Sequence, residues 1–249
     1  AEAQAMLKQI IEEKWLTASG VIGLFPANQV NGEDIEIRDP ASGEVLMTWH
    51  GLRQQNQKAE GKPNYCLSDF VLSKDSGQQD YIGAFAVTGG LGIEPHVKRF
   101  EAANDDYSAI MVKALADRFA EAFAELMHAK IRTELWGYVG NEQLSNDELI
   151  DEKYVGIRPA PGYPACPDHT AKNGLFRILG AESIGMQLTE GYAMLPTAAV
   201  SGFYFSHPDS RYFAVGKVDK DQVEAYAQRR GVSIEQAERD LAPNLGYNA

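Results

Sequence analysis

Apolar residues recur at helical spacing in several stretches of the chain, and each stretch predicts a helix. Residues 1–16 predict an amphipathic helix. A long helix is predicted from the polar cap Asn104-Asp105-Asp106 to about Trp136. Its expected core stripe is formed by Leu115, Phe119, Ala122, Phe123 and Leu126. Shorter helices are predicted after the capping box Ser145-Asn146-Asp147-Glu148 and over residues 175–179, 220–230 and 233–241.

Short apolar or alternating runs predict the strands. Residues 21–25 form an apolar run that ends at Pro26, and residues 81–87 predict a buried strand that ends at Thr88-Gly89-Gly90. Two hairpins are expected, one from 33–38 and 44–49 and one from 198–205 and 212–218. Helices and strands do not alternate as repeated βαβ units. The pattern therefore predicts an α+β fold, with one domain over residues 1–249 and a mixed, largely antiparallel sheet.

The segment with the most unusual composition is residues 156–170, GIRPAPGYPACPDHT, which holds four prolines. Proline fixes the backbone at low entropy cost and removes N–H donors, but every carbonyl acceptor remains. Such a loop can present carbonyls, the Arg158 guanidinium and the Tyr163 ring to a small ligand. A rigid connector has the same composition, so the two interpretations stay open on composition alone.

Charge and cysteine content narrow the function classes. A net charge of −12 argues against binding to nucleic acid or to an anionic membrane surface, and no apolar run approaches 18 residues. The two cysteines form no disulfide framework and lack the spacing of a zinc or iron–sulfur site, so no metal site is expected. Both thiols are expected to be reduced, as in a cytoplasmic protein.

No group of neighbouring residues in the sequence forms a catalytic motif. No Ser-His-Asp or Cys-His arrangement is visible, so no catalytic residue is assigned. Asp117, Glu121, Glu125 and His128 share one helical face, for which a solvated acidic surface is the favoured interpretation. Gly89-Gly90-Leu91-Gly92 lacks the spacing and lysine of a phosphate loop, and a turn is favoured.

Long motifs in order along the chain resemble one family. They run from GLFPAN at 23–28, through DYIGAFAVTGG at 80–90 and RPAPGYPACPDH at 158–169, to VSGFYFSHP at 200–208 and LAPNLGY at 241–247. Together they resemble the activation domain of cobalamin-dependent methionine synthase, a methyltransferase of methionine biosynthesis. The first residues already read as a helix in progress, so we expect a domain excised from a larger multi-module enzyme and truncated at its N-terminus.

The resemblance implies a module that binds S-adenosylmethionine and supports reductive methylation of cob(II)alamin to methylcobalamin, without activity in isolation. A neighbouring module would hold most of the cobalamin, and a flavodoxin-type donor would supply one electron. The implied residues around S-adenosylmethionine are Arg158, Pro159, Ala160, Gly162, Tyr163, Tyr212, Phe213 and Glu121. Asp117 and Tyr163 are implied to face the cobalamin module.

Two other functions fit the residues. One is a stand-alone S-adenosylmethionine-dependent methyltransferase, which would need a closed substrate pocket beside Arg158. The other is a docking module for flavodoxin and the cobalamin domain that binds no ligand. The activation function predicts an open, concave face sized for a flat corrin. Since flavodoxins are acidic, three basic pairs are candidates for docking: Lys98-Arg99, Lys130-Arg132 and Arg229-Arg230.

Overall fold

A computed structural model describes residues 2–248, so Ala1 and Ala249, the ends of the predicted domain, lie outside the described residues. Its helices are α1 (Glu2–Glu13), α2 (Glu94–Ala102), α3 (Asp106–Lys130), α4 (Asn146–Ile150), α5 (Ala171–Leu179), α6 (Lys220–Arg230) and α7 (Ile234–Asp240). Its strands are β1 (Thr17–Val30), β2 (Asp34–Arg38), β3 (Val45–His50), β4 (Asp80–Leu91), β5 (Gln187–Leu188), β6 (Met194–Leu195) and β7 (Ala199–Tyr204). No helix within this described part is long and apolar enough to cross a membrane.

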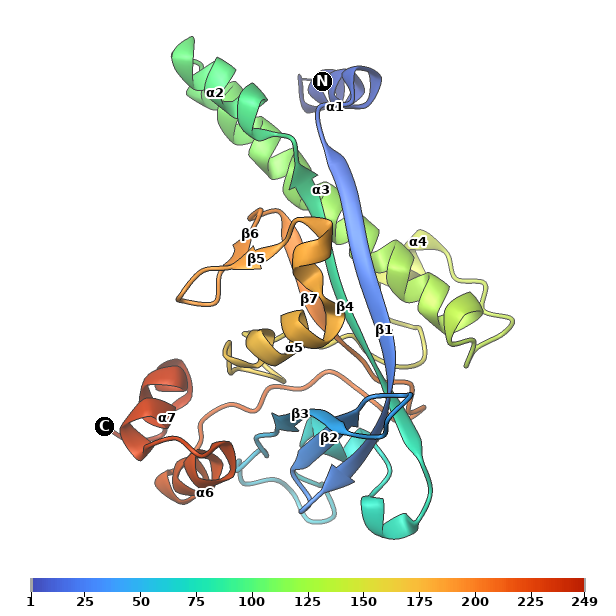
Figure 1. The fold of residues 1–249 in the computed structure, drawn as a ribbon, viewed down its shortest axis with the longest axis vertical. Coiled ribbons are helices and arrows are strands. Elements are labelled where there is room, and N and C mark those ends of the chain that lie inside the picture. The colour runs from blue at the N-terminus through green and yellow to red at the C-terminus, as the bar shows by residue number, and fades with distance from the viewer. Residues whose placement is uncertain (1, 249) are drawn as a thin grey trace.

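The main sheet has five strands in the order β3-β2-β1-β4-β7, and every neighbouring pair is antiparallel. The long strands β1 and β4 run side by side through the middle of the molecule, with α1 and α2 at one end and β2, β3, α6 and α7 at the other (Figure 1). The predicted α+β class is confirmed. The five-stranded sheet is antiparallel throughout, where a mixed, largely antiparallel sheet was expected.

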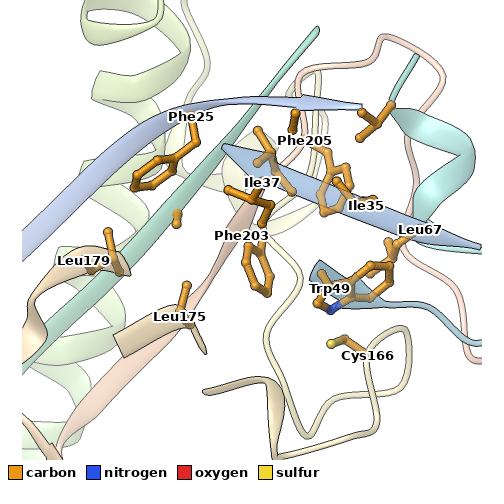
Figure 2. Close-up of a cluster of buried hydrophobic side chains, with 14 of the residues drawn as sticks. Phe25, Ile35, Ile37, Trp49, Leu67, Cys166, Leu175, Leu179, Phe203 and Phe205 are labelled. Carbon is orange, nitrogen blue, oxygen red and sulfur yellow. The ribbon is translucent and has the colours of Figure 1, made fainter. Parts of the chain in front are cut away.

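Strand β4 is buried on both faces because helices cover each side of the sheet. Ile82, Ala84 and Ala86 face the core that contains α5, while Phe85 and Val87 face α3. This alternation is the period of two expected of a strand. Figure 2 shows the first core, where Leu175 and Leu179 of α5 lie near Phe25 of β1 and Phe203 of β7. The result is three layers, with the sheet between α3 and α5.

Helix α3 lies unusually close to β4, and the contact is made by small residues. The buried positions of the helix include Ala116, Ala120 and Ala124, rather than the larger residues of the predicted stripe. Of that stripe, Leu115, Phe119 and Phe123 are half-buried, and Ala122 and Leu126 are exposed. A Cβ added at Gly89 would lie 2.8 Å from the backbone nitrogen of Ala120 and 3.0 Å from the carbonyl oxygen of Ala116.

Gly89 and Gly90 belong to β4, which ends at Leu91, so the expected turn begins only at Gly92, where φ is +94°. The absence of a side chain at Gly89 serves a packing contact, since only glycine allows the helix backbone to approach this closely. The same small-residue contact explains why the predicted stripe of α3 was only partly right, since Leu115, Phe119 and Phe123 pack beside the core while alanines form its centre. Helical periodicity identifies a face but not how near that face lies to its neighbour.

Most other elements agree with prediction, including the β2–β3 hairpin, the Asp105 and Ser145 caps, and α6 and α7. Strand β1 continues past Pro26, because β2 pairs with it only from Ala27 onward and needs no N–H from the proline. Helix α2 was missed, although Pro95 in its first turn is a favourable start signal.

The predicted strand at 212–218 is not formed. The backbone of this segment bonds to loops and side chains instead of to β7: the Val215 N–H donates to the Pro164 carbonyl, and the Ala214 carbonyl accepts from Gln54. Only Val218 makes an isolated bridge, to Leu245. The segment therefore lies beside the proline-rich loop, and not in the sheet.

The glycine contact gives a stability prediction. Gly89→Ala should lower the free energy of unfolding by about 1–3 kcal/mol, because the added methyl group overlaps backbone atoms of α3 that cannot move independently. Urea denaturation measures the change. Gly191→Ala is the matched control, since nothing lies within 4 Å of its added Cβ. Equal stability of the two variants would contradict the close contact.

Candidate functional site

The proline-rich loop is fastened along the outer edge of the sheet. Ile157 and Phe205 exchange backbone hydrogen bonds at 3.0 Å, and the Phe203 N–H donates to the Pro159 carbonyl, also at 3.0 Å. Gly202 of β7 permits this approach, because a Cβ there would lie 2.5 Å from the Pro159 oxygen. Backbone pairing therefore fixes the position of Arg158, whose neighbours on both sides are bonded to the sheet.

The second half of the loop is held by a tight turn and a buried carboxylate. Gly162 has φ +96°, and a Cβ there would lie 2.1 Å from Cε1 of His169, so both conformation and space require glycine. Asp168 is 5% exposed and accepts from the Tyr226 hydroxyl at 2.5 Å, which ties the loop to α6. The Tyr163 ring, between these two points, stays 60% exposed.

A cleft of about 540 Å³ lies between this loop, α3 and the 212–214 segment. Seven of the eight residues expected around S-adenosylmethionine line it: Glu121, Arg158, Pro159, Ala160, Tyr163, Tyr212 and Phe213. Gly162 lines an adjoining cleft of about 630 Å³ instead, and the two clefts share Tyr163. Asp117 lies exposed on α3, four residues before Glu121, and lines neither.

Glu152 also lines the first cleft and was not selected from the sequence. It has φ +55°, which is uncommon for a residue with a side chain. Its local sequence, Asp151-Glu152-Lys153, is that of an ordinary polar loop, so no signal was available. A third, smaller cleft of about 220 Å³ lies between β3, α5 and α6 and is lined by His50, Arg177 and Arg230, among others.

Arg158 projects from the loop toward α3, where polar groups surround its guanidinium. Nη2 donates to Oε2 of Glu125 at 2.6 Å, and Nη1 contacts Nδ1 of His128 at 3.0 Å and the Tyr154 hydroxyl at 3.3 Å. Its backbone N–H donates to the Tyr212 hydroxyl at 2.9 Å. Glu125 and His128 are therefore not part of a solvated acidic face, as the sequence suggested, but partners of the loop.

His128 is fully buried and stays neutral. Burial, reinforced by the charges of Arg132 and Arg158, lowers the pKa of His128 to about 2. Arg132 is also fully buried, and a fork of hydrogen bonds of 2.6–3.0 Å pairs its Nε and Nη2 with the Glu142 carboxylate. This pair binds the segment after α3 to the helix end and places Tyr154 beside Arg158.

The Cys166 thiol, within the proline-rich loop, is unsuited to nucleophilic chemistry. Cys166 is buried and free, and burial raises the pKa of its thiol to about 12. A thiol with so high a pKa has almost no thiolate at neutral pH. The groups that line the clefts are suited to binding and orienting a ligand by charge and shape.

Two of the three basic pairs proposed as docking sites do not form free basic surfaces, whereas Lys98 and Arg99 are both exposed on α2. Arg132 is buried, and Arg229 and Arg230 form ion pairs with Asp34 and Asp240 respectively. Arg99 stacks over the Trp15 ring at 4.9 Å. Spacing along the sequence could not reveal these partners, because Asp34 and Trp15 lie far away in the sequence and Asp240 belongs to the next helix, α7.

Comparison with known proteins gives two agreeing findings. The family model described as vitamin B12 dependent methionine synthase, activation domain, matches residues 1–231. A solved structure described as the MetH reactivation domain bound to AdoHcy is 57% identical and superposes with a TM-score of 0.94. The match covers 99% of this chain and 76% of that one.

The neutral state of His128 predicts a pH dependence of stability. In the unfolded chain the pKa of His128 is near 6.5. Below that pH the imidazole therefore binds a proton in the unfolded state but not in the folded state. Stability should therefore fall with decreasing pH, by up to about 1.4 kcal/mol per pH unit from this residue. Denaturation between pH 7.5 and 5 should show a shallower slope in His128→Asn than in wild type.

Tyr204→Phe is the control, because it leaves His128 and the stacked ring beside it in place and should retain the wild-type slope. An identical slope in His128→Asn and wild type would show that His128 titrates normally in the folded chain.

Proposed function

This chain belongs to the activation-domain family of vitamin B12 dependent methionine synthase, and from that membership we propose that it binds S-adenosylmethionine in the cleft beside Arg158. In this proposal the domain presents the methyl group to a cobalamin that a neighbouring module of the same enzyme holds. The observation that carries the proposal is the gathering of Arg158, Glu121, Tyr163 and Tyr212 around one cleft, from α3 and two separate loops.

The chemistry of the ligand matches the groups in the cleft. S-adenosylmethionine carries a carboxylate, which Arg158 can meet with parallel hydrogen bonds. Its sulfonium is a cation, for which the cleft offers the carboxylates of Glu121 and Glu152 and the aromatic faces of Tyr163 and Tyr212. The carbonyls of Pro159 and Ala160 already accept from Phe203 and Tyr163, which keeps the loop rigid.

Methyl transfer from a sulfonium needs no general base, since no proton moves. When bound by its own module, cobalamin supplies the cobalt nucleophile, after one electron from a flavodoxin-type donor. The contribution of this chain is to hold the sulfonium in a fixed place and orientation. Tyr163, exposed where the two clefts meet, is suited to contact the edge of a flat corrin or its module. Asp117, exposed on α3, is proposed to face the same module.

The adjoining clefts favour this function over a stand-alone methyltransferase. A stand-alone enzyme would enclose its acceptor beside the sulfonium, whereas here the rim of the cleft is an exposed aromatic residue with a second cleft beyond it. A docking module without a ligand would not need an arginine whose orientation is fixed inside a cleft. The reductive step and the flavodoxin-type partner remain part of the proposal.

Calorimetry with S-adenosylmethionine tests the ligand. The wild-type chain should bind it, and Arg158→Lys should weaken binding by about 1–3 kcal/mol, because a lysine keeps the charge but loses the planar fork. Arg177→Lys, which changes an exposed arginine that lines the cleft between β3, α5 and α6, should bind as wild type does. Unchanged affinity in Arg158→Lys and in Arg158→Ala would remove Arg158 from the site.

A further inference from the structure

The guanidinium of Arg158 has one definite orientation, because side chains from two segments bond to it. His128 and Tyr154 accept hydrogen bonds from the two N–H groups of Nη1, and Glu125 accepts one from Nη2. These bonds use three of the five N–H groups of a guanidinium. Nε–H and one Nη2–H remain, and neither has an acceptor among residues 2–248. Nε and Nη2 form the edge of the group that can meet a carboxylate side-on.

The contact with His128 also fixes a tautomer. A guanidinium only donates hydrogen bonds, so the 3.0 Å contact from Nη1 requires Nδ1 of His128 to be unprotonated. A neutral imidazole with an unprotonated Nδ1 carries its proton on Nε2. Protonation of the ring would place an N–H against a guanidinium and break the contact, in a site that also holds Arg132.

The direction of Nδ1 is fixed by aromatic neighbours. The imidazole stacks on the Tyr204 ring at 5.3 Å and meets the Tyr154 ring edge-on at 4.7 Å, with an interplanar angle of 78°. The residue is fully buried within α3, so the ring cannot turn away into solvent. His128 is thus a rigid acceptor aimed at one nitrogen of Arg158.

We infer that His128 is a positioning residue for the ligand: its unprotonated Nδ1 holds Nη1 of Arg158, so that the Nε–Nη2 edge faces the carboxylate of S-adenosylmethionine. Glu125 is the second anchor and partly neutralises the half-buried guanidinium. The inference rests on the proposed function for its ligand. The tautomer and the anchor to Arg158 are properties of the chain alone and can be measured without ligand.

The binding test uses two variants and two ligands. His128→Phe keeps the stacked ring but has no acceptor, whereas His128→Asn places an amide oxygen near the position of Nδ1. Calorimetry should show His128→Phe binding S-adenosylmethionine about tenfold or more weakly, as for loss of a hydrogen bond to a charged group, with His128→Asn restoring most of the affinity. Decarboxylated S-adenosylmethionine, which cannot use Arg158, should bind wild type and both variants equally.

Tyr204→Phe is the matched control, since it keeps the ring beside His128 and removes a buried hydroxyl that has no partner in the described part of the chain. It should bind both ligands as wild type does. If His128→Phe weakens both ligands equally, the residue has only a structural role. If it weakens neither, the inference is wrong.

Nitrogen NMR of the histidine-labelled chain tests the anchor without ligand. His128 should show an unprotonated Nδ1 and a protonated Nε2 from pH 8 to pH 5. A proton on Nδ1 would overturn the inference directly. If the wild-type chain shows this tautomer but does not bind S-adenosylmethionine, the proposed function and the carboxylate role fail together, while the anchor to Arg158 stands.

Discussion

The close contact between α3 and β4 at Gly89 determines where the candidate site forms. A helix normally packs on a sheet through large side chains, but here alanines meet a glycine, and the helix backbone lies directly against the strand. At that distance, the next turns of α3 bring Glu121, Glu125 and His128 to the level of the loop that follows Gly156. Without the contact, the helix would lie farther from the sheet and Arg158 would lose its partners Glu125 and His128.

A second constraint acts on the loop itself. Backbone bonds to β7 hold residues 157–159, and Gly162 and Asp168 hold the remainder, so the loop reaches the helix as a rigid body. The polar groups where loop and helix meet are desolvated, and desolvation is costly unless charges are paired. Pairing is provided by Glu125 for Arg158 and by Glu142 for Arg132, while His128 contributes an acceptor without adding a charge.

The sequence was informative where a signal is local. Caps, the β2–β3 hairpin, the buried character of β4 and the proline-rich loop can all be recognised from neighbouring residues. Family resemblance added the set of residues around one cleft, seven of which lie together. Local signals could not reveal that Tyr212 and Phe213 lie outside the sheet, because a short apolar run has the same pattern in either setting.

The partners of Arg158 could not be predicted from the sequence for a related reason. Glu125 and His128 have the spacing of an ordinary polar helix face, and only the approach of a loop from residues 154–158 turns that face inward. Glu152 has no local signal at all, since its place in the cleft follows from the path of the chain between Glu142 and Ile157. Such contacts depend on tertiary packing, which single-sequence patterns do not contain.

The most direct test of this account is a crystal structure of the chain grown with S-adenosylmethionine. The account predicts ligand density in the cleft between α3 and the proline-rich loop, with the carboxylate within hydrogen-bond distance of Nε and Nη2 of Arg158 and with His128 still bonded to Nη1. Ligand density in the cleft between β3, α5 and α6, or a carboxylate turned away from Arg158, would contradict it.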